Sequence, residues 1–70
     1  MQVKAQRGNY RIVDDAPMSL RMDGVGLYAI EELVKALDEQ CGWWKQVYPE
    51  SGKCTTDYEE VTRVFNQLTK

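Results

Sequence analysis

The sequence predicts a small α+β domain in which two amphipathic helices pack on one face of a three- to four-stranded, mostly antiparallel sheet. Three observations predict this fold: short alternating runs near the N-terminus, a long central stretch with helical periodicity, and a second such stretch near the C-terminus. A chain of 70 residues has room for one compact domain, residues 1–70, with a small core. The expected element order is β-β-β-α-β-α.

The N-terminal part of the chain predicts three strands. Residues 2–6 and 10–13 alternate in polarity around Arg7-Gly8-Asn9, and glycine and asparagine suit the positive φ angles of a tight hairpin turn. The following residues, up to Pro17, have the composition of a loop. In the segment Met18–Met22, apolar and polar side chains alternate strictly, which predicts a third strand.

The segment Asp23–Gly42 predicts the main helix. At 100° per residue one arc collects its apolar side chains, which are Leu27, Ile30, Leu33, Val34, Leu37 and Cys41. Asp23 suits an N-cap, and Gly42 suits the left-handed position after a helix. The alternative is a hairpin with its turn at Asp23-Gly24 and a return strand through Val25, Leu27 and Ala29. We prefer the helix because the arc extends beyond the usual length of a strand.

The C-terminal part predicts a strand, a turn and a second helix. Residues 43–48 are rich in aromatic and β-branched side chains, and residues 49–52 combine proline and glycine as a β-turn does. Thr56 and Glu59 have the spacing of a capping box. The helix that follows places its apolar side chains on one arc: Tyr58, Val61, Val64, Phe65 and Leu68.

Composition indicates a folded protein of the cytoplasm without a membrane partner. Hydrophobic residues make up 43% of the chain, which is too many for a disordered segment, yet no apolar run approaches the roughly 18 residues that span a bilayer. The N-terminal residues lack the apolar stretch of a secretory signal. Cys41 and Cys54 are therefore expected to be free thiols, although the sequence leaves open whether they ever pair.

The residue types present argue against an enzyme. Histidine is absent, and two cysteines cannot complete a structural zinc site, so we expect no metal and no cofactor. Asp14 and Asp15 are adjacent, but neighbouring side chains in a turn diverge and no third ligand is spaced to join them. Cys41 lacks an activating base, and the end of a helix disfavours a thiolate.

An aromatic cluster marks the leading candidate site. Trp43 and Trp44 are adjacent in a predicted strand, so they face opposite sides of the sheet and one of them should be partly exposed. The candidate partner-binding residues are Trp43, Trp44, Lys45, Tyr48 and Lys53. Exposed tryptophan beside lysine is typical of an interface hot spot, unless the helices or a second subunit cover both rings. We therefore expect a non-catalytic interaction module that binds a larger protein through residues Trp43 to Gly52, as small adaptors, regulators and phage- or plasmid-type inhibitors of host complexes do.

Basic residues near the N-terminus provide an alternative. Residues 1–22 contain four basic side chains, Lys4, Arg7, Arg11 and Arg21, against two acidic ones. Such a strip beside an exposed tryptophan would suit nucleic acid. The net charge of −2 makes this the second hypothesis. Homodimerisation is a third possibility, because a chain this small gains core by pairing.

Overall fold

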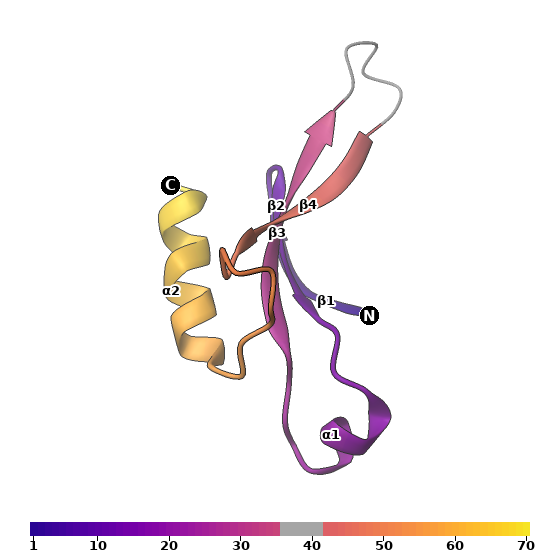
Figure 1. Ribbon diagram of the computed structural model, residues 1–70. Coiled ribbons are helices and arrows are strands. Elements are labelled where there is room, and N and C mark those ends of the chain that lie inside the picture. Colours follow the sequence, from indigo (N-terminus) through magenta and orange to yellow (C-terminus); the bar gives the residue numbers. More distant parts are fainter. Residues whose placement is uncertain (36–41) are drawn as a thin grey trace.

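The computed structural model describes residues 1–35 and 42–70, and in these residues it forms a four-stranded antiparallel sheet with two helices. The strands lie side by side in the order β1-β2-β3-β4, and the longer helix packs on one face (Figure 1). The elements in chain order are β1 (Gln2–Arg7), β2 (Tyr10–Asp14), α1 (Met18–Met22), β3 (Tyr28–Lys35), β4 (Gly42–Tyr48) and α2 (Tyr58–Leu68). The predicted α+β class and antiparallel sheet are confirmed.

The predicted N-terminal hairpin is confirmed. β1 and β2 pair antiparallel from Gln2↔Asp14 to Arg7↔Tyr10, with a register shift at Lys4. Gly8 has a φ of +59°, which is the left-handed conformation that the turn requires. The Asn9 carbonyl accepts a hydrogen bond from the Leu33 amide at 2.7 Å, so this turn is also fixed to β3.

The predicted third strand is wrong, because residues Met18–Met22 form the short helix α1. Pro17 precedes it with a φ of −67°, and its carbonyl accepts a hydrogen bond from the Arg21 amide at 3.1 Å. Five residues are too few to separate a period of two from a helical turn. Met18 and Met22, four residues apart, are 71% and 81% exposed, so no sheet face receives them.

The predicted central helix over Asp23–Gly42 is also wrong. Residues Tyr28–Lys35 form β3, an inner strand that pairs with β2 on one side and β4 on the other. Pairing on both sides satisfies the backbone of β3, and this tertiary context overrides the helix propensity of its Glu, Leu and Lys residues. Gly42 begins β4 instead of ending a helix. Leu37 and Cys41 of the predicted arc lie outside the described residues.

The corrected element order is therefore β-β-α-β-β-α. The hairpin alternative in the sequence came nearer to the structure, since Gly24 has a φ of +76° and an extended strand follows it. That strand begins at Tyr28, however, and its partner is β2 rather than residues 18–22. α1 lies in the connection between β2 and β3, at the end of the sheet (Figure 1).

The sheet has two unlike faces, which we call the helix face and the open face. On the helix face, Ile12 and Ile30 pair across β2 and β3 and pack with Val61 and Phe65 of α2. These four side chains are between 0% and 3% exposed and form the core. Side chains of alternate residues, including Arg11, Val13, Ala29 and Glu31, lie on the open face. Within the described residues, α2 packs broadly on the sheet, whereas α1 does not. The prediction that two helices pack on one face therefore holds for α2 and is wrong for α1, which lies in the β2–β3 connection.

The predicted strand and helix near the C-terminus are confirmed as β4 and α2, but the predicted cap is shifted by one residue. Asp57, not Thr56, is the N-cap of α2, and its Oδ1 accepts a hydrogen bond from the Glu60 amide at 3.1 Å. Thr55 forms a β-bridge to Tyr28 through two backbone hydrogen bonds of 2.7 and 2.9 Å. This bridge positions the start of α2 against the sheet.

Gly26 leaves room for the Tyr28 ring, so a larger residue at this position should destabilise the fold. A Cβ atom at this buried position would overlap the Tyr28 ring, whose centroid lies 4.8 Å from that of Tyr58. We expect Gly26→Ala to lower the free energy of unfolding by about 1–3 kcal/mol, because the ring must leave this packed position. Urea denaturation measures the loss. In a Tyr28→Ala background the same substitution should cost much less, and an equal cost in both backgrounds would contradict the explanation.

Candidate functional site

The β3–β4 hairpin extends beyond the rest of the sheet. β2 pairs with β3 only as far as Tyr10↔Glu32, whereas β3 and β4 remain paired to Lys35↔Gly42. In Figure 1 this part of the hairpin lies past the C-terminal end of α2. Its side chains therefore lie where α2 does not cover the sheet.

The two tryptophans lie on opposite faces of this extension, as adjacent strand residues must. Trp43 pairs with Val34 and lies on the helix face, while Trp44 pairs with Leu33 and lies on the open face. Trp43 is 56% exposed, and Trp44 is half-buried. The structure thus decides which ring is accessible, a point that the sequence left open.

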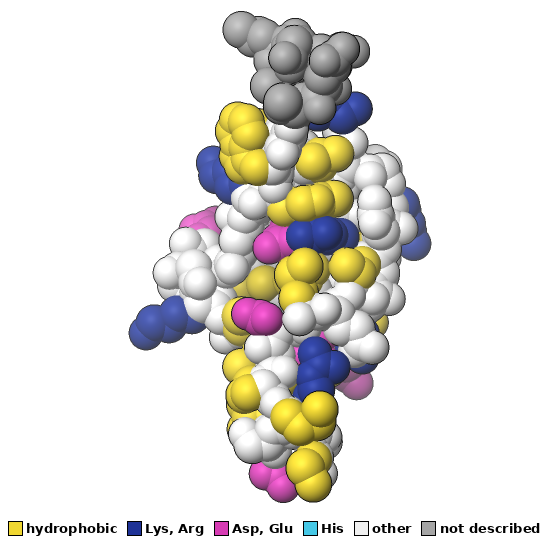
Figure 2. All heavy atoms as spheres, turned by 90° about the vertical axis from the view of Figure 1, so that its right-hand side faces the viewer, with side chains coloured by type: hydrophobic (Ala, Val, Ile, Leu, Met, Phe, Trp, Pro, Cys, Tyr) yellow, Lys and Arg dark blue, Asp and Glu magenta, His cyan; other side chains and the backbone are white. Residues whose placement is uncertain are grey.

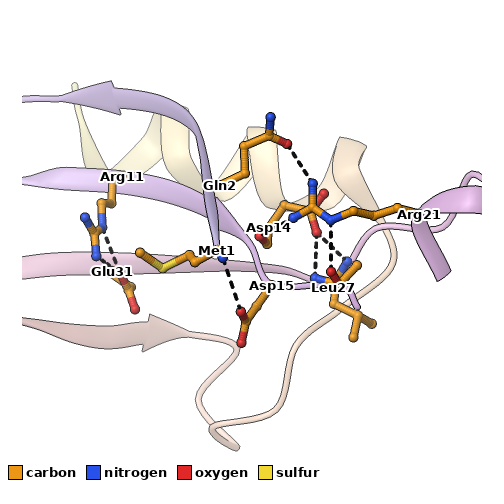
Figure 3. A network of polar contacts seen from close by, with 9 residues as sticks. Met1, Gln2, Arg11, Asp14, Asp15, Arg21, Leu27 and Glu31 are labelled. Atoms are coloured by element: carbon orange, nitrogen blue, oxygen red, sulfur yellow. Dashed lines mark hydrogen bonds and ion pairs between the residues drawn. The ribbon is translucent and has the colours of Figure 1, made fainter. Parts of the chain in front are cut away.

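Trp44 is covered by an arginine that is itself paired. The Arg11 guanidinium lies 4.0 Å from the centroid of the Trp44 ring. Arg11 also donates from Nε to Glu31 Oε1 at 2.8 Å, and its second nitrogen lies 2.6 Å from the same oxygen (Figure 3). These three residues come from β2, β3 and β4 and form a cation–π and ion-pair cluster on the open face. The helix predicted over Asp23–Gly42 gives Glu31 no position beside Arg11, so the sequence pattern does not predict this cluster.

Trp43 has polar neighbours on its own face. In the register, Lys45 pairs with Glu32, and Glu32 pairs with Tyr10. The neighbouring Glu32 carboxylate, together with burial, raises the pKa of Tyr10. Lys45 is exposed, so the accessible tryptophan has a lysine close by on the same strand face.

The other predicted partner-binding residues are not joined to Trp43 in one patch. Tyr48 is half-buried against the core, and its pKa is raised by burial and by the nearby Glu60 carboxylate. Lys53 is exposed in the turn after β4. Its carbonyl and that of Pro49 each accept a hydrogen bond from Gln46 Nε2 at 3.1 Å. The turn is thus fixed to β4 by Gln46, a role that the sequence pattern did not indicate.

The structure separates the four basic residues of the alternative site. Arg7 lies on the helix face, where its guanidinium is 5.7 Å from the Phe65 ring and donates to Thr69 Oγ1. Arg11 lies on the open face. Arg21, at the end of the sheet, donates to the carbonyls of Ala16 and Asp14 and to the Gln2 side chain (Figure 3). Lys4 lines a small polar recess with Asp14 and Arg21.

Asp14 is the buried charge of this region. The residue is 4% exposed, and its Oδ1 accepts hydrogen bonds from the amides of Ala16 at 3.0 Å and Leu27 at 3.2 Å (Figure 3). Burial alone would raise its pKa, but these two amides, with Arg21 and Lys4, outweigh burial and lower the pKa below its ordinary value. Asp15 is exposed and turned toward the N-terminal ammonium at 4.0 Å. The two carboxylates therefore diverge, as expected for neighbours in a turn.

The remaining candidate groups are isolated in the part of the chain that the structure describes. Cys54 is an exposed free thiol, and partial desolvation together with the nearby carboxylates of Asp15, Asp14 and Glu31 raises its pKa. Cys41 lies outside the described residues. Within residues 1–35 and 42–70, no three potential ligand side chains gather as a metal site. No helix in these residues combines the length and the apolar character needed to cross a bilayer.

Comparison of the chain with protein-family models, with curated proteins and with solved structures found no match.

Proposed function

We propose that this chain is a non-catalytic protein–protein interaction module that binds a larger protein through residues Trp43 to Gly52, with Trp43 at the centre of the contact. Small adaptors, regulators and inhibitors of larger complexes act in this way. The observation that carries the proposal is the 56% exposure of Trp43 on a hairpin that extends beyond the sheet.

An exposed tryptophan is a strong anchor for a protein partner. Its ring offers a large apolar area together with one hydrogen-bond donor, and tryptophan is enriched among the residues that dominate binding energy. β3 and β4 pair on both sides of this position and hold the Trp43 backbone, so little backbone conformational entropy is lost on binding. Lys45 and Lys53 add positive charge along the same segment, which favours a partner with acidic groups around an apolar pocket.

Nucleic-acid binding, the alternative expected from the sequence, has weaker support. Arg7 and Arg11 lie on opposite faces of the sheet, and Arg21 is engaged with two carbonyls and an amide. A phosphate-binding strip needs several cations on one surface.

We also propose a cytoplasmic setting, supported by the free thiol of Cys54, which a reducing compartment preserves.

Trp43→Ala tests the proposal by affinity capture. The tagged chain is incubated with lysate of its source cell, with and without nuclease, and captured proteins are quantified. Loss of a hot-spot residue costs at least about 2 kcal/mol, so the captured amount of the specific partner should fall roughly 30-fold or the Kd should rise equally. Met22→Ala is the matched control, since Met22 is 81% exposed but lies in α1.

Two outcomes would contradict this function. The first is a partner captured equally well by the wild type and Trp43→Ala, with both proteins showing the same urea-denaturation midpoint. The second is capture that disappears after nuclease treatment, which would transfer support to the arginine-based alternative. Partial recovery of binding in Trp43→Phe would show that an aromatic ring, rather than the fold alone, makes the contact.

A further inference from the structure

We infer that the partner in the proposed function is bound by strand addition, in which an extended segment of that protein pairs along the outer edge of β4 and continues the sheet. This inference rests on the proposed function, because it names the form in which the Trp43 surface recognises its partner. It stands on the direction of the backbone groups of β4, on the side chains that flank its edge and on the contrast with the other edge of the sheet.

The outer edge of β4 carries backbone groups that point away from the sheet. β4 is the last strand in the order β1-β2-β3-β4. The Leu33 amide donates to the Asn9 carbonyl on the β2 side, so Leu33 directs its backbone away from β4. Leu33 pairs with Trp44, which makes this a non-hydrogen-bonded pair and turns the amide and carbonyl of Trp44 outward. Alternation along the strand turns the backbone of Gln46 outward as well.

These outward groups are accessible and suit an extended chain. Within residues 1–35 and 42–70, no hydrogen bond joins the backbone of Trp44 or Gln46 to a segment on the outer side of β4. Trp43 is 56% exposed and Lys45 is exposed, so this part of the strand is open to solvent. One residue of an added antiparallel strand can accept from the Trp44 amide and donate to the Trp44 carbonyl. A helix cannot do so, because its own backbone groups are already bonded within the helix.

The side chains beside this edge define the chemistry of the added strand. On the helix face they are Trp43 and Lys45, so the segment needs an apolar residue beside the first and an acidic residue beside the second. On the open face the neighbour is Trp44, which favours a β-branched or other apolar residue. Figure 2 shows this open face, where hydrophobic and basic side chains lie together at the end of the sheet next to the residues drawn in grey. The expected segment is therefore extended, largely apolar, and acidic opposite Lys45.

β1, the opposite edge of the sheet, is less suited to an added strand. Its register with β2 shifts at Lys4, and such an irregularity interrupts the run of outward groups. β1 also carries two cations, Lys4 and Arg7, against one in β4. The register of β4 is regular from Gly42 to Gln46. The accessible Trp43 lies in that regular part, so the proposed contact and the open edge coincide.

Hydrogen exchange and a peptide titration, followed by NMR on the full chain, test the inference. In the free chain the Trp44 amide should exchange at least about tenfold faster than the amides of Trp43 and Lys45, which point toward β3. The probe is the peptide acetyl-Thr-Glu-Val-Leu-Thr-amide, which in antiparallel pairing places glutamate beside Lys45 and leucine beside Trp43. At about 2 mM it should slow exchange of the Trp44 amide about threefold if the Kd is about 1 mM. The peptide with lysine in place of glutamate is the control and should have a smaller effect.

A backbone change at Trp44 tests the partner protein itself. Ligation of a synthetic 41–70 segment at Cys41 allows N-methylation of the Trp44 amide. This change removes one outward donor and keeps every side chain and the pairing with β3. In the affinity capture designed for Trp43→Ala, the N-methylated chain should retain at least about tenfold less of the partner that the wild type captures. The chain N-methylated at the exposed Lys70 is the matched control.

Any of three results overturns strand addition. The first is a protected Trp44 amide in the free chain: protection at every concentration means that the chain itself occupies the edge, and protection that grows with concentration means that a second copy does. The second is exchange at Trp44 that the glutamate peptide leaves unchanged. The third is equal capture by the wild type and the chain N-methylated at Trp44.

The proposed function can survive the loss of this inference. If capture falls in Trp43→Ala but not in the chain N-methylated at Trp44, the protein contact stands and only strand addition is removed. If neither change affects capture, the proposed function is contradicted as well. Urea midpoints equal to that of the wild type verify that both chains fold. The peptide titration uses the wild-type chain, so it decides the question even if N-methylation destabilises the hairpin.

Discussion

Asp14→Ala is expected to lower the free energy of unfolding by about 2–4 kcal/mol at pH 7. The substitution removes Oδ1, which accepts hydrogen bonds from the amides of Ala16 and Leu27. These donors lie in the two ends of the connection that contains α1, so their loss leaves two amides unpaired beside a buried site. Asp15→Ala is the matched control, because Asp15 is exposed and should change stability by less than about 0.5 kcal/mol.

The same carboxylate predicts a pH dependence with a definite sign. The pKa of Asp14 is lower in the folded chain than its ordinary value, so the unfolded chain binds its proton more readily. Asp14 therefore stabilises the fold at pH values above the unfolded pKa of about 3.9, and this contribution is lost as the pH falls through the lower folded pKa.

Urea denaturation of the wild type and Asp14→Asn across pH 7 to 2.5 isolates this contribution. Asparagine keeps an oxygen acceptor but carries no charge, so the wild type should be more stable at pH 7 and the difference should shrink in acid. A difference that stays constant over the whole range would show that the charge of Asp14 has no role in stability.

Phe65→Ala is expected to cost about 3–5 kcal/mol, because Phe65 is 3% exposed and fills the space between α2 and the sheet. At roughly 0.05–0.15 kcal/mol per residue, a chain of 70 residues has only about 4–10 kcal/mol of stability in total. The variant should therefore be marginal or unfolded at 25 °C. Circular dichroism during thermal or urea denaturation measures the change.

Leu68→Ala on the same helix is the matched control for Phe65. Leu68 is 39% exposed, so its truncation should cost less than about 1 kcal/mol. Equal losses for the two variants would mean that α2 does not pack on the sheet through the side chains described above.

Elements defined by local chemistry were predicted well. The β1–β2 hairpin depends on a glycine turn between two short runs, and α2 depends on an acidic N-cap followed by a clear apolar arc. In each case the deciding residues lie within a few positions of one another. The opposite directions of Trp43 and Trp44 were also predictable, because they follow from strand geometry alone.

The middle of the chain could not be assigned locally. In β3, Ile30 and Val34 lie on one face with a spacing that also suits a helix, and Leu33 completes an apparent arc. The strand forms because β2 and β4 pair with its two edges, which is a non-local condition. The Arg11–Glu31 pair joins residues 20 positions apart, so it becomes visible only once β3 is placed beside β2.

The sequence by itself determined the α+β class, the antiparallel hairpin, the C-terminal helix and the presence of two oppositely directed tryptophans. These features follow from turn chemistry, periodicity and side-chain alternation, which act over short distances along the chain. The tertiary structure decided that residues 28–35 are a strand, that Asp14 is buried, and that Trp43 rather than Trp44 is exposed. These outcomes depend on which segments meet in space, because strand pairing and burial are completed by residues far away in the sequence.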